Sequence, residues 1–295
     1  KGITDARDRK PENSLFFTSD VFFNSYNNLF TELLKEMENK VFYPKMKSLS
    51  EKFYTEAQKK LDSATSDTEK TKWMKIRNYF AIPYAIFSTA AAPLGNNNYI
   101  SSTGDMLDPA KVMADYKAND AKVDTIESVT GFIKKLNLDA ESEKAVLADL
   151  TAIYEAEGAY TPAIFKPEYT QYAEQEEVEF KVDFSQFTPR SHYTGSSLRR
   201  QYFRGMKWFI EVAFFVKSPA LTDYAFGVTQ LLAENPTEFN DYGNMEATIN
   251  FMVGGSDDLM PVDYLKALDS AKGAADQTSA IMDYLAKAHN PKIKS

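Results

Sequence analysis

The chain has 295 residues, no cysteine and two histidines, and 34 basic against 42 acidic side chains give it a net charge of −8. Without cysteine there is no disulfide, thiolate catalysis or cysteine-based zinc site, and two histidines cannot form a three-histidine metal site. We therefore expect no metal and no cofactor, and the acidic balance argues against a nucleic-acid partner. No run of about 20 apolar residues is present, so we expect no transmembrane segment.

The first hundred residues predict three helices. Apolar side chains recur at helical spacing through residues 21–41, and residues 18–20 supply polar caps. A second helix covers the apolar positions of residues 46–61. Ser66 begins a capping-box pattern that opens a third helix. Pro83 is expected to kink or end that helix, because proline has no backbone N–H.

The middle of the chain is acidic, with 8 basic and 18 acidic residues at positions 101–188. Such a segment is typical of a solvated outer layer. Asp108, with proline at the next position, begins a predicted helix that runs towards Leu136, and Asp139 caps the next helix. Residues 178–184 alternate apolar and charged side chains, which is the one clear strand pattern. A single strand needs a partner, so we expect a small sheet or an extended arm there.

Helical patterns return in the last third of the chain. One helix begins after Ser196, and Pro219 and Pro236 each begin another. Two shorter helices are predicted over residues 262–268 and 278–288. The helical spacing therefore dominates the C-terminal part as it dominates the N-terminal part.

These patterns predict a mainly α fold. We expect a multi-helical globule with one short extended segment near residues 178–184. The length and the lack of a clear boundary favour a single helical domain over residues 1–295, with an irregular central segment at 158–196.

The densest group of polar side chains is Arg190, His192 and Tyr193, followed by Arg200 and Arg204 in the next helix. The two helical arginines lie one turn apart on one face. Together with the free N–H groups at the start of that helix, they form a candidate anion site. In the alternative interpretation, His192 and Tyr193 cap and pack the helix, and the arginines pair with the acidic middle segment.

A second group joins Gly254 and Gly255 to Asp257 and Asp258. In the structural interpretation, a glycine ends one helix at positive φ and an aspartate caps the helix that begins near Pro261. The alternative is a carboxylate pair that binds a hydroxylated ligand or Ca²⁺. Both interpretations place these residues in a loop between helices.

Three separate stretches of the chain resemble a family of large bacterial and archaeal proteins, domain of unknown function 3160. The stretches are residues 17–22, residues 187–194 with 198–208, and residues 251–258. The Pro-Arg-x-His-Tyr-Thr run that begins at Pro189 is the most specific of them. The resemblance covers most of the chain and brings no established activity.

The resemblance implies an extracytoplasmic setting, because family members are often exported, some of them as lipoproteins, and are often longer than this chain. Family members tend to carry histidines in the first helix, where this chain has Asn24 and Asn27. A metal bound by such histidines elsewhere is therefore not expected here.

Each polar group lies at a predicted helix end, where loops meet and free backbone groups are available. We therefore expect Asp20, Arg190, His192 and Asp257 to line one shared region, with the arginine charge set against the two aspartates. The leading interpretation is a non-enzymatic cell-envelope protein that binds a small molecule or a glycan there.

Two other functions remain open. The first is a hydrolase of envelope polysaccharide or peptide that uses two carboxylates, for which a separation of about 5–5.5 Å or 6.5–9.5 Å would indicate a glycosidase. The second is a purely structural surface module, which would have no cleft.

Overall fold

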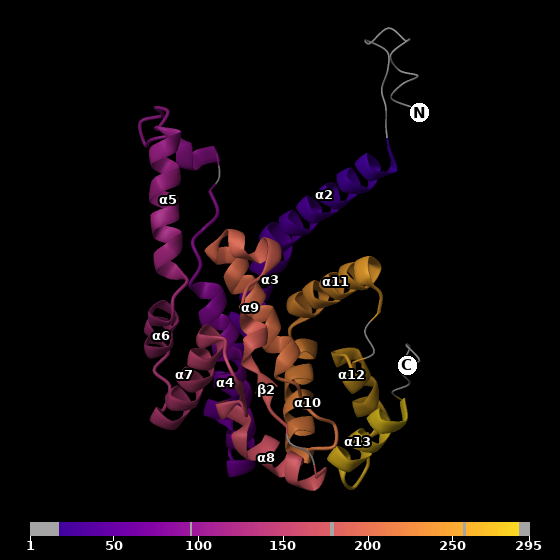
Figure 1. Ribbon diagram of the computed structural model, residues 1–295. Coiled ribbons are helices and arrows are strands. Elements are labelled where there is room, and N and C mark those ends of the chain that lie inside the picture. Colours follow the sequence, from indigo (N-terminus) through magenta and orange to yellow (C-terminus); the bar gives the residue numbers. More distant parts are fainter. Residues whose placement is uncertain (1–17, 95, 178–179, 256–257, 289–295) are drawn as a thin grey trace.

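The computed structural model describes residues 18–94, 96–177, 180–255 and 258–288 and confirms a mainly α-helical fold (Figure 1). The helices are α2 (Ser19–Met37), α3 (Tyr43–Ser63), α4 (Asp67–Ser88), α5 (Pro109–Val123), α6 (Ile126–Lys135), α7 (Ala140–Glu155), α8 (Lys166–Gln175), α9 (Ser197–Glu211), α10 (Pro219–Glu234), α11 (Pro236–Val253), α12 (Pro261–Ser270) and α13 (Gln277–Ala288). Shorter helical turns are the π-turn η3 (Glu38–Phe42) and the 3-10 turns η4 (Asn96–Tyr99), η5 (Ala163–Phe165), η6 (Phe184–Phe187) and η7 (Ser191–Gly195). The strands are β1 (Ala159–Tyr160) and β2 (Val182–Asp183).

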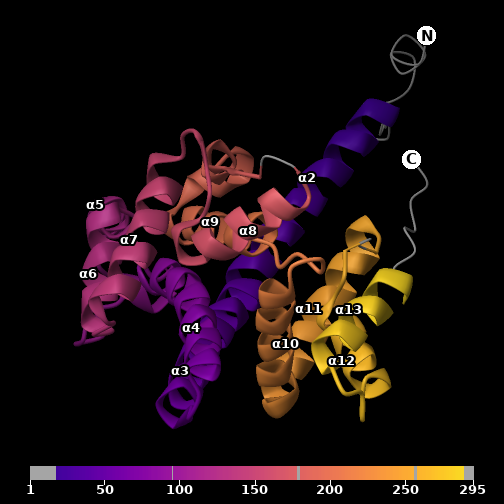
Figure 2. The same cartoon turned by 90° about the horizontal axis from the view of Figure 1, so that it is seen from below.

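The helices lie in three groups (Figures 1 and 2). Helices α5, α6 and α7 lie on one side of the central α3, α4 and α9, and α10 to α13 lie on the other. Helix α4 packs against members of all three groups, and its residues Ile76, Ile82 and Ile86 are fully buried in the main core. A smaller cluster centred on Ala267 and Leu285 joins α10, α12 and α13. Helix α4 is therefore the scaffold to which the other groups attach.

Helix α4 does not end at Pro83 but continues to Ser88, contrary to one of the two expected outcomes. Proline lacks an N–H, so the carbonyl of Tyr79, four residues earlier, loses its partner within the helix. The indole N–H of Trp208, from α9, donates to this carbonyl at 3.1 Å, and both residues are buried. The tryptophan takes the place of the missing backbone donor, and this allows the helix to pass through the proline.

The helix expected from Asp108 towards Leu136 is two helices in the structure, and this corrects the prediction. Helix α5 ends at Val123, and α6 follows after a short break. The break forms because the Thr125 hydroxyl accepts the N–H of Ser128 at 3.2 Å and so caps a new helix.

The expected strand is also shorter than its pattern. Only Val182 and Asp183 pair, antiparallel with Tyr160 and Ala159, and residues 178 and 179 lie outside the described part of the chain. The Asp183 carboxylate then accepts the N–H of Ser185 at 3.0 Å, which begins η6 and ends the strand.

Helix α2 projects away from the three groups (Figures 1 and 2). None of its residues is buried, and the π-turn η3 connects it to α3. Its N-cap is Thr18, whose side chain accepts the N–H of Val21 at 3.2 Å. The helix expected over residues 21–41 is therefore present, but most of its apolar face is not part of the core.

Candidate functional site

Glu38 is the centre of the polar cluster that holds His192 and Tyr193. Both glutamate oxygens are used: His192 Nε2 lies 2.9 Å from Oε2, and the Tyr193 hydroxyl donates to Oε1 at 2.6 Å. The glutamate is buried, and the His192 and Tyr193 rings lie against each other with centroids 4.0 Å apart. Burial and the Glu38 carboxylate raise the pKa of Tyr193 well above its usual value. The cluster joins the start of η3 to η7.

Arg200 and Arg204 pair with the acidic middle segment, which is the alternative stated above. Arg200 Nη2 lies 3.1 Å from Asp120 Oδ2, and both arginines contact Asp124. The other Asp120 oxygen accepts the N–H of Ser197 at 2.8 Å. The start of α9, a candidate anion site in the sequence, is thus occupied by a carboxylate of the chain itself.

The pKa of Asp120 agrees with a charged carboxylate at the start of α9. Burial raises the pKa of this carboxyl, but the hydrogen bonds from Ser197 and Arg200 and the Arg200 charge outweigh that effect, so its pKa lies below the ordinary value. A carboxylate held in its charged form satisfies both the helix N-terminus and the arginine.

Asp20 does not join this cluster, and the expectation of one shared region is not met for it. It is exposed at the start of α2, 18 positions before Glu38. At a rise of about 1.5 Å per residue, this is roughly 27 Å along the helix. Arg190 is exposed at the residue before η7, so it lies next to His192 in the chain.

Asp257 lies outside the described residues, and Asp258 is exposed in the loop before α12. Asp258 is not the cap of that helix: the carboxylate of Asp263 accepts the N–H of Met260 at 3.0 Å instead. Helix α12 packs on α10 and α13, whereas η7 packs on α9. As expected for the end of α11, Gly254 follows it with a φ of 94°.

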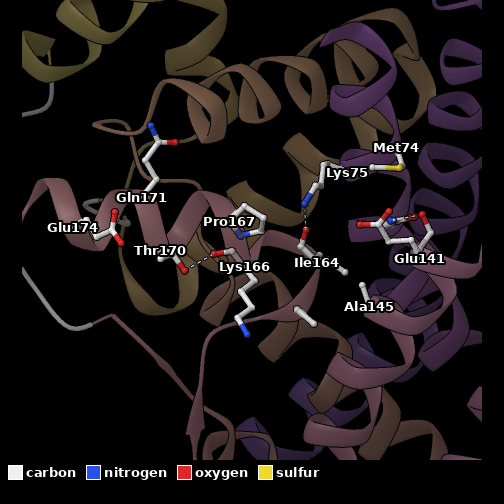
Figure 3. Close-up of a pocket in the computed structure, with 13 residues that line it drawn as sticks. Met74, Lys75, Glu141, Ala145, Ile164, Lys166, Pro167, Thr170, Gln171 and Glu174 are labelled. Carbon is white, nitrogen blue, oxygen red and sulfur yellow. Dashed lines mark hydrogen bonds between the residues drawn. The ribbon is translucent and has the colours of Figure 1, made fainter. Parts of the chain in front are cut away.

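A cleft lies elsewhere, between α4, α7 and the segment η5–α8 (Figure 3). Its volume is about 560 Å³. Residues from all three elements line it: Met74, Lys75, Asn78, Glu141, Ser142, Ala145, Ala163, Ile164, Lys166, Pro167, Thr170, Gln171 and Glu174. None of these residues was singled out by the sequence patterns.

One wall of the cleft is held in place by two ionisable side chains, Asp149 and Lys75, and Lys75 also lines the cleft. The Asp149 carboxylate accepts the N–H groups of Ala163 and Ile164 at 2.6 and 3.0 Å. Lys75 Nζ donates to the Ile164 carbonyl at 2.6 Å and pairs with Glu168 at 3.2 Å. Burial raises the pKa of Asp149 to about 7. The backbone of η5 is thereby held on both its N–H and its carbonyl side.

The inner end of the cleft is a closed hydrogen-bonded network. The Ser142 hydroxyl accepts from Asn78 at 2.9 Å and from the buried Arg77 at 2.8 Å. Arg77 also pairs with Asp139, the N-cap of α7, at 3.0 Å. These contacts join α4 to α7 at one end of the cleft.

The outer residues carry both signs of charge. Glu141 stands at one end of the opening and Glu174 at the other, with Lys166 between them (Figure 3). All three are exposed. Preformed walls and exposed charged groups at the opening are features of sites that bind a small polar molecule.

Within the described ranges, no group of three or more His, Asp or Glu side chains is placed to hold a metal ion. In the same ranges, no helix has the length and apolar character needed to cross a membrane.

Sequence reasoning missed Glu38, Asp120 and Asp124, and the reason is the distance to their partners. Glu38 contacts a residue 154 positions away, and Asp120 contacts one 77 positions away. In the sequence each carboxylate appears in a helical pattern, where it is typical of a solvated face. The one usable signal was the acidic excess of the middle segment beside a cluster of arginines.

The chain matches the family described as Protein of unknown function (DUF3160) over residues 6–295, and it belongs to this family. No curated protein and no solved structure matches it significantly.

Proposed function

We propose that the protein is a non-enzymatic binding protein whose ligand enters the cleft between α4, α7 and α8. The observation that carries this proposal is the cleft itself. Its volume of about 560 Å³ lies within the usual range for small-molecule sites, about 300–1,000 Å³. Two of its walls are fixed by Asp149, Lys75 and Arg77, so the site exists before the ligand arrives.

The charges of the cleft favour a small zwitterionic ligand such as an amino acid or a short peptide. Glu141 and Glu174 suit an ammonium group, and Lys166 suits a carboxylate. None of the thirteen lining residues is aromatic, so no ring is available to stack on a sugar. Of the small-molecule and glycan ligands expected from the sequence, the cleft therefore favours the small molecule.

The test is a binding screen on the purified chain. Amino acids, dipeptides and neutral sugars are compared by thermal shift, and hits are measured by calorimetry. We expect Lys166→Ala to weaken binding of the best zwitterion at least tenfold without a change in melting temperature. Lys144→Ala, an exposed lysine of α7 that does not line the cleft, is the control. Preferential binding of sugars, or equal effects of the two variants, would contradict the proposal.

For the hydrolase alternative, the candidate carboxylates are Glu141 and Glu174, which stand at opposite ends of the cleft (Figure 3). A peptide bound between them would contact both. If the protein is a hydrolase, Glu141→Gln and Glu174→Gln would each abolish turnover of a peptide library, whereas in a binding protein the unaltered chain shows no turnover to abolish. Unchanged peptides after prolonged incubation with the unaltered chain favour the binding protein.

We also propose an extracytoplasmic, cell-envelope location. The family resemblance supports it, and the absence of cysteine is compatible with it. Fractionation of the source cells, followed by protease treatment of intact cells, is the test. We expect the protein to be protease-accessible once the outer surface is permeabilised, while a cytoplasmic marker stays protected.

A further inference from the structure

Helix α2 exposes a row of large apolar side chains that the described part of the chain leaves largely uncovered. Phe22, Tyr26, Leu29 and Leu33 are between 51% and 71% exposed, and we call these four residues the α2 seam. The main contact of α2 is with η3 at its C-terminal end. In proteins most of the stability of a helix comes from packing of its apolar face, and the α2 seam is largely without such packing within the described residues.

The spacing of the α2 seam indicates that a helix covers it. The steps between its residues are 4, 3 and 4, the alternation of four and three that characterises the seam of a heptad coiled coil. At about 100° per residue, the four side chains fall within roughly 60° of the helix circumference. Two further exposed apolar side chains of α2, Val21 and Phe23, flank this stripe.

The charges of α2 argue against a lipid surface as the occupant. A helix that lies on a membrane typically carries lysines and arginines along its polar face. Helix α2 carries Asp20, Glu32 and Glu36 against one basic residue, Lys35. That lysine is paired with Glu32 at 2.6 Å. The helix is thus acidic, and anionic lipid would repel it.

The seam is complementary to itself. A 4-3-4 spacing is the same in both directions, so two antiparallel copies align layer by layer: Phe22 lies opposite Leu33 of the second copy, and Tyr26 opposite its Leu29. On the flank of the seam, Glu32 then faces Ser25 of the second copy, so no like charges meet. The first half of α2 extends beyond the body (Figures 1 and 2), which leaves room for a second body at the opposite end.

We propose that α2 pairs with α2 of a second copy of this chain in an antiparallel two-helix contact. Phe23, which is 65% exposed beside the seam, joins the same face. Covering these five side chains buries on the order of 500 Å² on each copy. The total of about 1,000 Å² reaches the lower bound of specific interfaces and indicates a reversible dimer.

The first test is the mass of the full chain in solution, measured by light scattering and sedimentation at about 1 to 100 µM. We expect twice 33.3 kDa at the upper concentrations. Leu29→Glu should restore the monomer, and Asn28→Glu, exposed on the other side of α2, should not. Both variants should fold, because α2 contributes no buried residue, and circular dichroism checks this. A monomer at all concentrations, or equal effects of the two variants, would overturn the proposal.

The second test reports the orientation. Because the chain has no cysteine, an introduced thiol is the only one present. A mixture of Tyr26→Cys and Leu29→Cys should give the mixed disulfide on mild oxidation. Disulfides formed mainly within Leu29→Cys alone would indicate parallel helices and overturn the antiparallel arrangement. A third experiment tests lipid binding by flotation of the protein with vesicles of phosphatidylglycerol and phosphatidylethanolamine. If the protein binds the vesicles and Leu29→Glu abolishes this binding, the α2 seam contacts lipid and the dimer proposal is wrong.

Discussion

His192 Nε2 lies 2.9 Å from Glu38 Oε2, although the two residues are 154 positions apart in the chain. Glu38 is the first residue of the π-turn between α2 and α3. Together with the hydroxyl of Tyr193, the imidazole occupies both oxygens of a carboxylate that is buried at this joint. Insertions of this kind in a helix mark places where its direction changes or a function is built in. The pair therefore ties the joint between α2 and α3 to η7.

Removal of this carboxylate should destabilise the fold. Glu38→Ala leaves the Tyr193 hydroxyl and a ring nitrogen of His192 without their partner, which typically costs about 1–3 kcal/mol. Glu32→Ala, six positions earlier, removes an exposed carboxylate paired with Lys35 and should lower the free energy of unfolding far less than Glu38→Ala does. Urea unfolding followed by circular dichroism measures both free energies. Equal values would show that the buried pair does not hold the joint.

The bond between Trp208 and the Tyr79 carbonyl should depend on Pro83. Trp208→Phe leaves the carbonyl unpaired in the unaltered chain, but in a Pro83→Ala background the new N–H at position 83 can reach it. We expect the tryptophan substitution to cost about 1 kcal/mol less in that background. A double-mutant cycle of unfolding free energies gives the coupling directly. If the effects of the two substitutions add within about 0.3–0.5 kcal/mol, the Trp208 indole does not replace the backbone N–H that Pro83 lacks.

Stability should decrease as the pH rises towards neutrality, because of Asp149. Burial raises its pKa to about 7 in the folded chain, whereas the unfolded chain releases this proton near pH 4. The contribution of Asp149 to the free energy of unfolding is therefore greatest below about pH 4. It decreases by up to about 4 kcal/mol between pH 4 and 7 and is constant at higher pH. Unfolding free energies at a series of pH values should show this decrease. In Asp149→Asn the profile should be flatter.

The control for this pH profile is Asp115→Asn, an exposed carboxylate of α5 paired with Lys111. It should leave the pH profile unchanged. The same slope in the unaltered chain and in Asp149→Asn would assign the pH dependence to another group. Because Asp149 fixes the backbone of η5, ligand binding in the cleft should weaken in Asp149→Asn as well.

Two helical glycines should respond in opposite ways to alanine. A Cβ at Gly205 in α9 would lie 2.3 Å from the ring of Phe87, which is fully buried in α4. Gly205→Ala should therefore destabilise the chain by about 1–3 kcal/mol. Gly131 in α6 has open space around the same position, and Gly131→Ala should stabilise by up to about 1 kcal/mol. Thermal unfolding of the two variants gives the comparison, and a melting temperature that rises in both would contradict the close approach of α9 to α4.

The sequence predicted best those features that depend on near neighbours. Asp108 and Asp139 were expected as helix caps, and their carboxylates accept the N–H groups of Ala110 and Ser142 at 3.0 and 2.9 Å. A cap uses a donor two or three positions away, so its residues can be identified in one short stretch. The same reasoning identified α10 and α11 from the prolines at their first positions.

The features that the sequence did not predict depend on partners far along the chain. Pro83 has the pattern of a helix end, and only Trp208 from another helix changes that outcome. The cleft is formed by α4, α7 and the segment η5–α8, and its lining residues are a mixture of polar and apolar side chains that no local pattern joins. Asp20 and His192 both lie at helix ends, as the sequence indicated. They do not lie together, because Asp20 is at the far end of α2.

The hydrogen bond from Trp208 to the Tyr79 carbonyl of α4 also has a consequence for folding during protein synthesis. Trp208 follows Tyr79 by 129 positions, and a chain is made at about 5–20 residues per second. The hairpin of α3 and α4 therefore emerges roughly 6–26 s before the indole that satisfies its open carbonyl. During that interval the α4 surfaces later covered by α9 and α10 face solvent or a chaperone. The hairpin of α3 and α4 is therefore completed only when α9 has been made.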